Sequence, residues 1–420
     1  MLLLNMKIII ISEYNCWSSI GGTEYYTEML IKGLVFLKKE VVFITFGTQN
    51  DKIIYKTACW NNFNYKVVFI PTRYFSVAEI KQEIVSSTWN DILPILKQEI
   101  PYIIHVHTYS TFFNIRHFEE CAKYFNNIIF TSHIPGHFCP KGDLIKFNQQ
   151  PCDGVIYSRC IFCLFSKNIK AGLSNLIFQY HKKVLGRLLL LNKLGVSLVC
   201  VSEWQRQHVI SNGFDKENVT VIRQAIHVDI NKKSSDEKLG CPFTVGYLGR
   251  LSKEKGSVFL LKLIDRLLNT SGINFVLGIP RNNSNNADLE RLDALAIHAS
   301  DRIKIMDHVN EGNKALFFKE IDCLLIPSFC IETGPIVLLE AILYNKHVLG
   351  PNTGGPSEFK KEFPDRVMTY SWNNLANAIE KILWLSKRPD TIDDPEPFLK
   401  EREIYFMKKH MELYNQLKAK

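Results

Sequence analysis

Short apolar runs alternate with amphipathic stretches along most of the chain, and this alternation limits the folds that the sequence can adopt. In the first half, strands are predicted at residues 7–12, 40–46, 65–70, 102–107, 127–132 and 196–202. Helices are predicted there from Thr23, Val77, Asn114 and Ala171. The second half repeats the pattern, with strands predicted at residues 243–249, 273–278, 302–306, 322–327, 346–350 and 366–370. Because such alternation builds parallel sheets covered by helices, the sequence predicts an α/β protein with two doubly wound, Rossmann-like domains.

The length of 420 residues exceeds what one hydrophobic core usually supports, so two domains are expected. Between the two halves lies NKKSSDEKLG (residues 231–240), a polar segment with Gly and Ser and the best candidate for a linker. We therefore assign residues 1–230 to an N-terminal domain and residues 231–394 to a C-terminal domain. The last segment, about residues 395–420, has helical periodicity, with one face formed by Ile404, Met407, Met411 and Tyr414.

The composition is that of a globular protein, with 46% apolar and 22% charged residues. No apolar run is long enough to span a bilayer, and the apolar N-terminus lacks the basic start and the cleavage site of a signal peptide. The chain has 11 cysteines and no evident secretory signal, which fits a reducing compartment. We therefore expect a cytoplasmic protein.

The segment from Ser328 to Gly350 is mostly apolar, yet it keeps two acids, Glu332 and Glu340, on either side of Pro335. Proline suits the first turn of a helix, whose free N–H groups and dipole together form an anion site. A buried carboxylate costs on the order of several kcal/mol if it is unpaired, and sugar hydroxyls are good partners. The two acids therefore indicate a ligand with phosphate and polyol groups. The alternatives are a salt bridge for Glu340 and a solvated loop position for Glu332.

Three further segments place glycines or cations where a ligand could approach the backbone. The loop GYLGRLSKEKGS (residues 246–257) carries Arg250 and Lys255 behind a predicted strand, where the charge of a diphosphate could be held. A second Gly-rich turn, PNTGGPSEF, follows at residues 351–359. In the first domain, the pair Gly21 and Gly22 precedes a predicted helix and permits close approach of a phosphate or a sugar.

In the order GGTE, GRLSKEKG and E-x7-E followed by a Gly-rich turn, the chain resembles the retaining glycosyltransferases of family 4, which have the GT-B fold. The similarity runs from Lys7 to the last predicted strand. It implies an acceptor-side domain and a nucleotide-sugar-binding domain that face a cleft, with a C-terminal helix that crosses back to the N-terminal domain. It also implies a hexosyltransferase of class EC 2.4 that takes its sugar from a UDP or GDP type donor. No cofactor is expected for catalysis, and no DxD motif appears.

The resemblance also implies roles for individual residues. Arg250 and Lys255 match the basic pair that neutralises the diphosphate. Glu340 matches the acid that binds the ribose hydroxyls, and Glu332 the acid that contacts the transferred sugar. The phosphates and the sugar would also be held by the backbone of Gly334, Pro335, Ile336 and Val337. The family's Pro-Asn-Gly-type turn is replaced here by VIRQAIHVD (residues 221–229), which leaves the donor motifs untouched.

A histidine of the N-terminal domain lies near the reacting sugar in this family. His133, in FTSHIPGH, occupies the matching place and is the predicted catalytic histidine, together with Glu332, Arg250 and Lys255. A histidine at a strand end is more often a structural hydrogen-bonding group than a catalyst. The competing candidates in the sequence are His105, His107 and His137.

Four cysteines fall in one loop-like segment with the spacing C-x12-C-x7-C-x2-C, namely Cys139, Cys152, Cys160 and Cys163. Four thiolates can hold a zinc ion in a closed tetrahedral site, which would stabilise a long loop. The sequence thus raises the hypothesis of a structural zinc site. The alternative is a set of buried or incidental free cysteines.

The net charge of +9 is unevenly spread. No acid lies between Asp153 and Glu203, whereas this stretch contains Arg159, Lys167, Lys170, Lys182, Lys183, Arg187 and Lys193. Together with the apolar residues of FQYHKKVLGRLLLLNKL, these cations suggest contact with an anionic membrane that presents a lipid-linked acceptor. The alternative is an ordinary helix whose leucines lie in the core. No nucleic-acid-binding module is recognisable.

These observations predict a retaining glycosyltransferase that extends a surface polysaccharide or a glycolipid, at the inner face of the cell membrane. Two alternatives stay open. One is another GT-B enzyme, such as a nucleotide-sugar epimerase. The other is a nucleotide-sugar-binding protein without catalytic activity, and the intact pairs Glu332/Glu340 and Arg250/Lys255 weigh against it.

Overall fold

The computed structural model describes residues 6–13, 21–47, 52–71, 85, 87–109, 112–139, 141–152, 159–160, 162–163, 186–228, 242–270, 272–387 and 394–418. The chain divides into two compact units. Unit 1 comprises Met1–Gly142, Cys152–Ala225 and Glu403–Lys420, and unit 2 comprises Asp143–Pro151 and Ile226–Arg402. The helices predicted from Val77 and Ala171 and the predicted linker at residues 231–240 lie outside the described residues.

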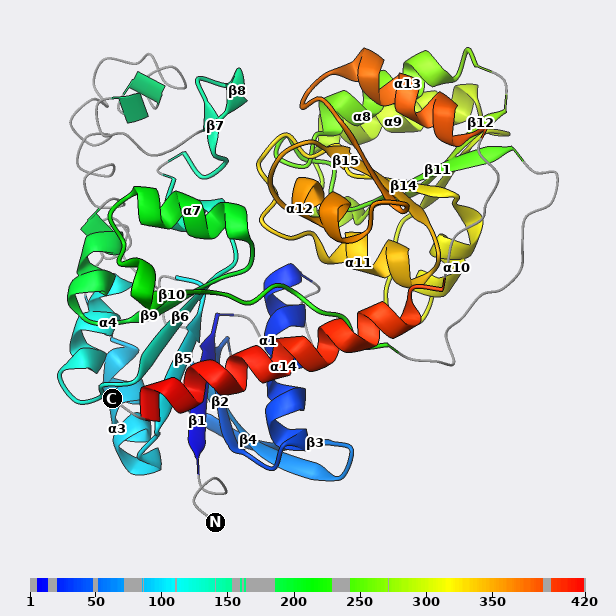
Figure 1. The fold of residues 1–420 in the computed structure, drawn as a ribbon. Helices are drawn as coiled ribbons and strands as arrows, with labels where there is room; N and C mark the ends of the chain where they lie inside the picture. Colours follow the sequence, from blue (N-terminus) through cyan, green and yellow to red (C-terminus); the bar gives the residue numbers. More distant parts are fainter. Residues whose placement is uncertain are drawn as a thin grey trace. The chain divides into compact units, whose positions relative to one another are not determined.

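Unit 1 is built on a sheet of eight described strands in the order β10-β9-β6-β5-β1-β2-β4-β3 (Figure 1). Its strands are β1 (Lys7–Ser12), β2 (Glu40–Phe46), β3 (Ile54–Trp60), β4 (Phe63–Ile70), β5 (Ile103–His107), β6 (Ile128–Ser132), β9 (Ser197–Cys200) and β10 (Val219–Val221). Neighbouring strands run parallel except for the edge pair β3 and β4. The central strands are apolar runs because helices cover both faces of the sheet.

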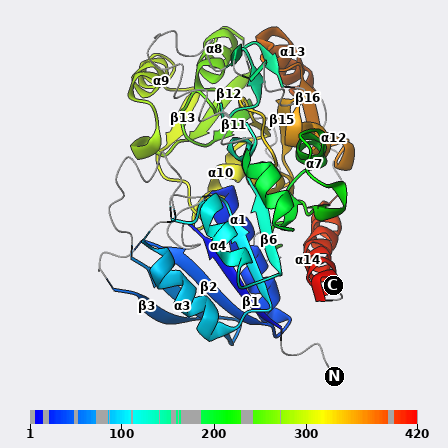
Figure 2. The same ribbon diagram turned by 90° about the vertical axis from the view of Figure 1, so that its left-hand side faces the viewer.

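One face of this sheet packs against α1 (Gly22–Phe36) and the end of α14 (Glu396–Lys418), which supply residues to a single core (Figure 1). A Cβ atom added to Gly33 would collide with the side chain of Met407, so glycine permits the close approach of the two helices. The other face packs against α3 (Trp89–Glu99), α4 (Ile115–Ala122) and α7 (Glu203–Ser211). Figure 2 shows α3 and α4 in front of the strands.

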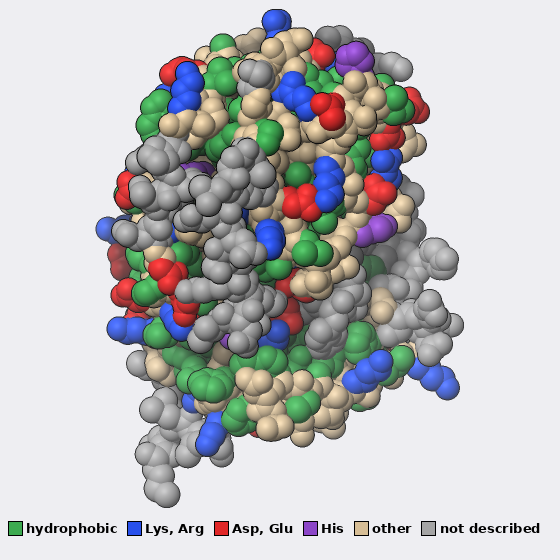
Figure 3. All heavy atoms as spheres, turned by 90° about the vertical axis from the view of Figure 1, so that its right-hand side faces the viewer, with side chains coloured by type: hydrophobic (Ala, Val, Ile, Leu, Met, Phe, Trp, Pro, Cys, Tyr) green, Lys and Arg blue, Asp and Glu red, His purple; other side chains and the backbone are tan. Residues whose placement is uncertain are grey.

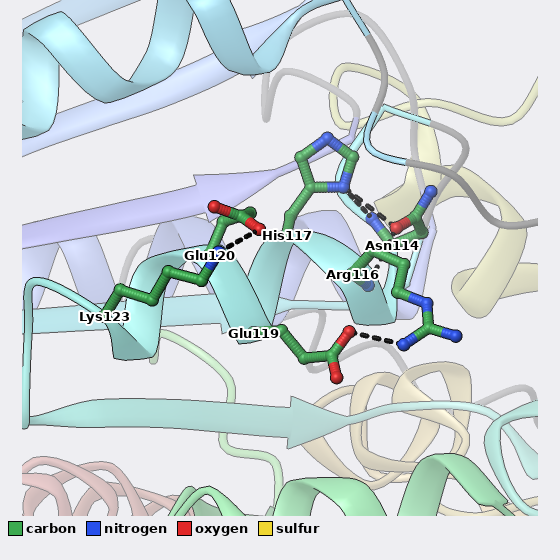
Figure 4. Close-up of polar contacts among 6 residues, drawn as sticks. All are labelled: Asn114, Arg116, His117, Glu119, Glu120 and Lys123. Carbon is green, nitrogen blue, oxygen red and sulfur yellow. Dashed lines mark hydrogen bonds and ion pairs between the residues drawn. The ribbon is translucent and has the colours of Figure 1, made fainter.

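The start of α4 shows how local chemistry sets a helix boundary (Figure 4). The Asn114 side chain accepts from the backbone N–H of Arg116 at 2.9 Å, and Nδ1 of His117 accepts from the backbone N–H of Asn114 at 3.0 Å. Two backbone donors that the helix cannot pair internally are thereby satisfied. His117 is fully buried, and burial lowers its pKa to about 4 although the Asn114 backbone works in the opposite direction. The Asn114 position confirms the predicted start of this helix.

The face of α14 that packs on unit 1 agrees with the prediction in part, because Tyr414 is buried and Met407 and Met411 pack against the same core. The buried side chains are Phe406, His410, Leu413, Tyr414 and Leu417. Ile404, which was predicted to lie on this face, is 69% exposed. The sequence pattern was read from apolar residues alone, whereas the structure buries His410 by pairing both of its ring nitrogens.

Unit 2 contains a parallel sheet of six described strands in the order β13-β12-β11-β14-β15-β16. The strands are β11 (Phe243–Leu248), β12 (Ile273–Gly278), β13 (Ile303–Met306), β14 (Cys323–Leu325), β15 (His347–Pro351) and β16 (Val367–Tyr370). Its helices include α8 (Ser257–Leu267), α9 (Asn286–His298), α10 (Lys314–Glu320), α11 (Ile336–Leu343), α12 (Gly354–Glu362) and α13 (Leu375–Leu385). A short hairpin of β7 (Ile145–Lys146) and β8 (Gln150–Pro151) also belongs to this unit. All strands predicted for the second half are present.

Candidate active site

The loop that connects β11 to α8 carries Arg250 and Lys255 and is held by its backbone. The Glu254 carbonyl accepts from the backbone N–H groups of Phe329 and Cys330, at 3.0 and 3.1 Å. Gly256 ends the loop in a left-handed conformation (φ 74°) and caps α8. A Cβ atom there would collide with the carbonyl oxygen of Pro327, so only glycine fits. The loop is therefore fixed against the segment that follows β14.

Lys255 and Glu332 form an ion pair across this contact. Lys255 Nζ lies 2.7 Å from Glu332 Oε1, and the Ser328 hydroxyl donates to the same oxygen at 2.5 Å. The Glu332 side chain is only 13% exposed, whereas that of Lys255 is 36% exposed. The Glu332 carboxylate is thus fixed by hydrogen bonds and is not a solvated loop acid. The ammonium of Lys255 is partly exposed and can also bind an anion. Arg250 lies exposed on the same loop, and its carbonyl accepts from the Tyr247 hydroxyl at 2.6 Å.

The two members of the pair stabilise each other's charged form. Burial alone would raise the pKa of Glu332, but the Lys255 charge and the hydrogen bonds from Lys255 and Ser328 hold it below its usual range. The Glu332 charge raises the pKa of Lys255 above its usual range, although burial acts in the opposite direction. Both side chains are therefore charged at neutral pH.

A Gly-rich turn fixes the backbone next to Glu332. The Gly355 N–H donates to the Glu332 carbonyl at 2.7 Å. Gly354 has a left-handed conformation (φ 57°), and a Cβ atom there would collide with the same carbonyl oxygen. A Cβ atom built on Gly355 would lie about 3 Å from backbone atoms of Gly334 and from the Pro335 ring, so the two segments pack closely at this point. The sequence motif at residues 351–359 therefore acts by shaping the loop before α11.

The helix α11 begins one residue later than expected. Pro335 is its N-cap, with extended backbone (φ −70°, ψ 116°), and the first helical residue is Ile336. One of the N–H groups of this first turn, that of Leu338, donates to the Pro335 carbonyl at 3.1 Å. The anion site predicted at this helix start thus loses Leu338 as a donor, because the first turn closes on the N-cap carbonyl.

Glu340 lies within α11 and pairs with a lysine from another helix. Lys314 Nζ lies 2.6 Å from Glu340 Oε1, and the Glu340 side chain is 13% exposed. The salt bridge considered as an alternative from the sequence is therefore present. It does not exclude a sugar ligand, because an ionised carboxylate has about four acceptor positions.

In unit 1, His133 follows β6 and is buried among aromatic and histidine rings. Its Nε2 lies 3.0 Å from Nδ1 of His107, and the two rings stack. The Tyr26 ring meets it edge-on, with ring centroids 4.9 Å apart. The competing histidines have other partners: His105 pairs with the Tyr414 and Thr131 hydroxyls, and His137 pairs with the Ser132 hydroxyl.

Acidification is expected to destabilise unit 1 between about pH 6.5 and pH 4. Burial lowers the pKa of His133 to about 3 and that of His410 to about 4, the latter against the opposing effect of the Phe406 carbonyl. Both stay neutral when folded, whereas the unfolded chain takes up protons below about pH 6.5, so stability falls as the pH falls. We expect a loss of roughly 2 kcal/mol per such histidine by pH 5.

Thermal unfolding at pH 7 and pH 5 measures this effect. His410→Leu should show a smaller drop in melting temperature between the two pH values than the wild type. His298→Leu, at an exposed position in α9, serves as the control. An equal drop for wild type and His410→Leu would contradict the prediction.

The glycine pair of unit 1 lies at the start of α1. Gly21 is the N-cap with extended backbone, and Gly22 is the first helical residue and is exposed. A Cβ atom added to Gly21 would collide with the carboxylate of Glu24, which is buried in the first turn. An acid of the chain itself therefore already faces this helix start, where negative charge is favourable.

The four cysteines of the zinc hypothesis are all described. Among the residues that the structure covers, no group of three or more His, Cys, Asp or Glu side chains could hold a metal ion. Cys139, Cys152, Cys160 and Cys163 are partly buried thiols that do not form such a group. The structure thus gives the zinc site no support, and it stays a prediction for metal analysis of the purified protein.

Most of the acid-free basic stretch lies outside the described residues. In its described part, Leu188 and Leu191 are buried in the core of unit 1, which agrees with the interpretation as an ordinary helix. Arg187 lies over the Tyr109 ring at 5.5 Å.

On the face seen in Figure 3, acidic and basic side chains are interspersed. Among the described residues, no helix is long and apolar enough to cross a membrane.

Sequence reasoning did not find the ion pair of Lys255 and Glu332, and it also missed three further contacts at the site. Ser328 holds Glu332, Lys314 holds Glu340, and Trp372 donates from Nε1 to the Phe329 carbonyl at 3.1 Å. Ser328 lies four positions before Glu332, a spacing that could have suggested a contact. For Lys314 and Trp372 the sequence offers no comparable signal, because their partners lie in distant segments.

Comparisons with known proteins agree with this architecture. Among solved structures, sucrose-phosphate synthase from Thermosynechococcus elongatus is 15% identical, with 99% of each chain covered and a TM-score of 0.67. HepE from Anabaena in complex with UDP-glucose is 15% identical over 99% of this chain and 100% of that one (TM-score 0.64). The same values hold for the catalytic domain of starch synthase IV from Arabidopsis thaliana bound to ADP and acarbose. The fold is GT-B, as predicted.

Family models match both halves of the sequence, whereas no curated protein matched it. The model for glycosyl transferases group 1 matches residues 229–394. The model for glycosyltransferase family 4 matches residues 20–230, half of the chain. The protein therefore belongs to glycosyltransferase family 4.

Proposed function

We propose that the protein is a retaining glycosyltransferase that moves a hexose from a UDP or GDP sugar to a glycan or a lipid-linked acceptor. The observation that carries this proposal is the ion pair of Lys255 and Glu332, which joins two loops fixed by Gly256 and Gly354. In this pair, the partly exposed ammonium of Lys255 can bind a diphosphate, and the fixed carboxylate of Glu332 can accept hydrogen bonds from sugar hydroxyls. The solved structures of HepE with UDP-glucose and of starch synthase IV with ADP support a nucleotide-linked donor.

Charge stabilisation would supply most of the catalysis. Negative charge develops on the diphosphate when the bond to the sugar breaks, and Lys255 and Arg250 would offset it. Prearranged charges of this kind lower the barrier because they need no reorganisation during the reaction. The N–H groups at the start of α11, together with the backbone of Gly334, would add to this stabilisation.

The two glutamates are not proposed as an acid and base pair. The pKa of Glu332 is held below its usual range, so the group is a weak base at neutral pH. Glu332 would instead accept hydrogen bonds from the transferred sugar, and Glu340 from the ribose. In a retaining reaction on this fold, a phosphate oxygen of the donor would take the proton of the acceptor.

His133 is proposed to contact the sugar as a neutral imidazole. Burial lowers its pKa to about 3, so the ring carries no charge at neutral pH and can act as a hydrogen-bonding group only. Its pairing with His107 fixes the ring orientation, which is the property that a sugar-contacting group needs.

The acceptor side of the proposal rests on the family and on the basic stretch. We propose a role in surface polysaccharide or glycolipid synthesis on the cytoplasmic side of the membrane, with peripheral contact to anionic lipid. Catalysis would need no metal or other cofactor, because Lys255 and Arg250 take the place of a metal at the diphosphate.

Two measurements test the proposal. In a thermal-shift panel of UDP, GDP, ADP and their sugars, one nucleotide series should raise the melting temperature as its concentration exceeds its Kd. With that donor, the anomeric configuration of the product, read by NMR, should equal that of the donor. A product of opposite configuration would contradict retention, and isomerised donor without transfer would indicate an epimerase.

A further inference from the structure

Lys314 is a buried lysine at the start of α10 that joins two carboxylates. Its side chain is 9% exposed, and its ammonium pairs with Glu340 Oε1 at 2.6 Å and with Glu311 Oε1. Glu340 is 13% exposed, whereas Glu311 is 59% exposed. Because lysine is rarely buried, the desolvation of its charge has to be offset by specific partners.

The turn before α10 holds Lys314 in place through asparagine side chains. The Asn313 Oδ1 accepts from the Asn310 N–H at 2.7 Å, and the Asn310 Oδ1 accepts from the Gly312 N–H at 2.9 Å. The Asn310 carbonyl accepts from the Lys314 N–H at 2.8 Å. The backbone that carries Lys314 is thus defined by short-range bonds and does not depend on Glu340.

The two carboxylates beside Lys314 stabilise its charged form. Burial alone would lower the pKa of Lys314, but the charges and hydrogen bonds of Glu340 and Glu311 raise it above its usual range. Lys314 is therefore a cation at neutral pH. An ammonium in contact with Glu340 favours the ionised carboxylate, which accepts hydrogen bonds and donates none.

We propose that Lys314 is a positioning residue for the nucleotide ribose: it keeps Glu340 ionised and engages one side of the carboxylate, which leaves the group oriented as an acceptor for the ribose hydroxyls. This inference rests on the proposed function, in which Glu340 binds the ribose. Glu311 is a peripheral counter-charge, because it is exposed and contributes to Lys314 rather than to Glu340.

The consequence is a preference for ribonucleotides that depends on Lys314. A site built to bond a hydroxyl group rejects an analogue without it, since its own buried polar group is then left unpaired. The wild type should bind a nucleoside diphosphate roughly 10- to 100-fold more tightly than the 2′-deoxy form. In Lys314→Met, Glu340 loses its cation and its orientation, so this ratio should fall towards one.

The experiment uses the full chain and titration calorimetry with UDP, GDP and their 2′-deoxy counterparts. Glu311→Gln is the matched control and should keep the wild-type ratio. Lys314→Met leaves the buried Glu340 without the lysine that pairs with it, which could impair folding. The double variant Lys314→Met/Glu340→Gln removes this buried charge, so it should fold and should also bind the ribonucleotide and its 2′-deoxy form about equally. Thermal melts confirm folding of each variant.

The outcomes separate the inference from the proposed function. If folded Lys314→Met keeps the wild-type ratio within about twofold, the positioning role is wrong while donor binding stands. If Glu311→Gln loses the preference for ribonucleotides as fully as Lys314→Met does, the positioning of Glu340 depends on the whole charge network and not on Lys314 itself. If the wild type binds no nucleoside diphosphate, the proposed function fails and the inference fails with it.

Discussion

Replacing Lys255 with methionine is expected to lower kcat/KM for sugar transfer by about 10²- to 10³-fold, the loss typical of one group that stabilises transition-state charge. Methionine keeps the unbranched, flexible side chain up to its fourth atom and removes the ammonium. The diphosphate then loses a counter-charge, and Glu332, which is 13% exposed, loses its ion-pair partner. Steady-state kinetics with the donor found in the thermal-shift panel measures the effect.

Two matched variants identify the cause of this loss. Lys253→Met removes an exposed lysine from the same loop and should keep nearly full activity. Lys255→Arg keeps the charge but changes its geometry, so it should recover part of the activity. Should Lys255→Met retain activity within about threefold of the wild type, Lys255 would have no role in charge stabilisation.

Replacing Gly256 with alanine is expected to destabilise unit 2 by roughly 2–5 kcal/mol. Gly256 has a left-handed backbone, which costs a residue with a Cβ atom about 1–2 kcal/mol. The new methyl group would also collide with the Pro327 carbonyl, a backbone atom that cannot move without shifting the segment that bears Glu332. Activity should therefore fall together with stability.

Comparison with Gly272→Ala separates the cost of backbone strain at Gly256 from the cost of the collision with Pro327. Gly272 is also left-handed (φ 80°), but a Cβ atom there meets nothing within 4 Å. Calorimetric unfolding should show that Gly272→Ala costs only the backbone strain, about 1–2 kcal/mol. Equal losses in the two variants would mean that the contact with Pro327 relaxes freely and does not hold the loop.

The strands could be predicted well because their signal is local. The runs at β1, β2 and β11–β16 are apolar, since both faces of a parallel sheet are covered by helices. The edge strand β3 was missed because most of its side chains are exposed and it carries no apolar run. Helix α3 was missed too, and Pro94 within it obscures the helical pattern.

The site could be predicted only in part. The loop with Lys255, the two acids and the Gly-rich turn were found from residue type, spacing and resemblance. Their contacts were not, because Lys255 and Glu332 are 77 positions apart and Lys314 and Glu340 are 26 apart. No spacing rule connects side chains over such distances, since the strand order decides which loops become neighbours.

By itself, the sequence determined the fold class, the repeated strand and helix pattern, and the family, because hydrophobic periodicity and glycine-bearing motifs are local properties of a chain. Only the tertiary structure decided which cation meets which carboxylate: Lys255 with Glu332, and Lys314 with Glu340. It also decided that His410 is buried, through its hydrogen bonds to Tyr26 and Phe406. The physical reason is the cost of burying a polar group, which depends on partners that folding brings together from distant parts of the chain.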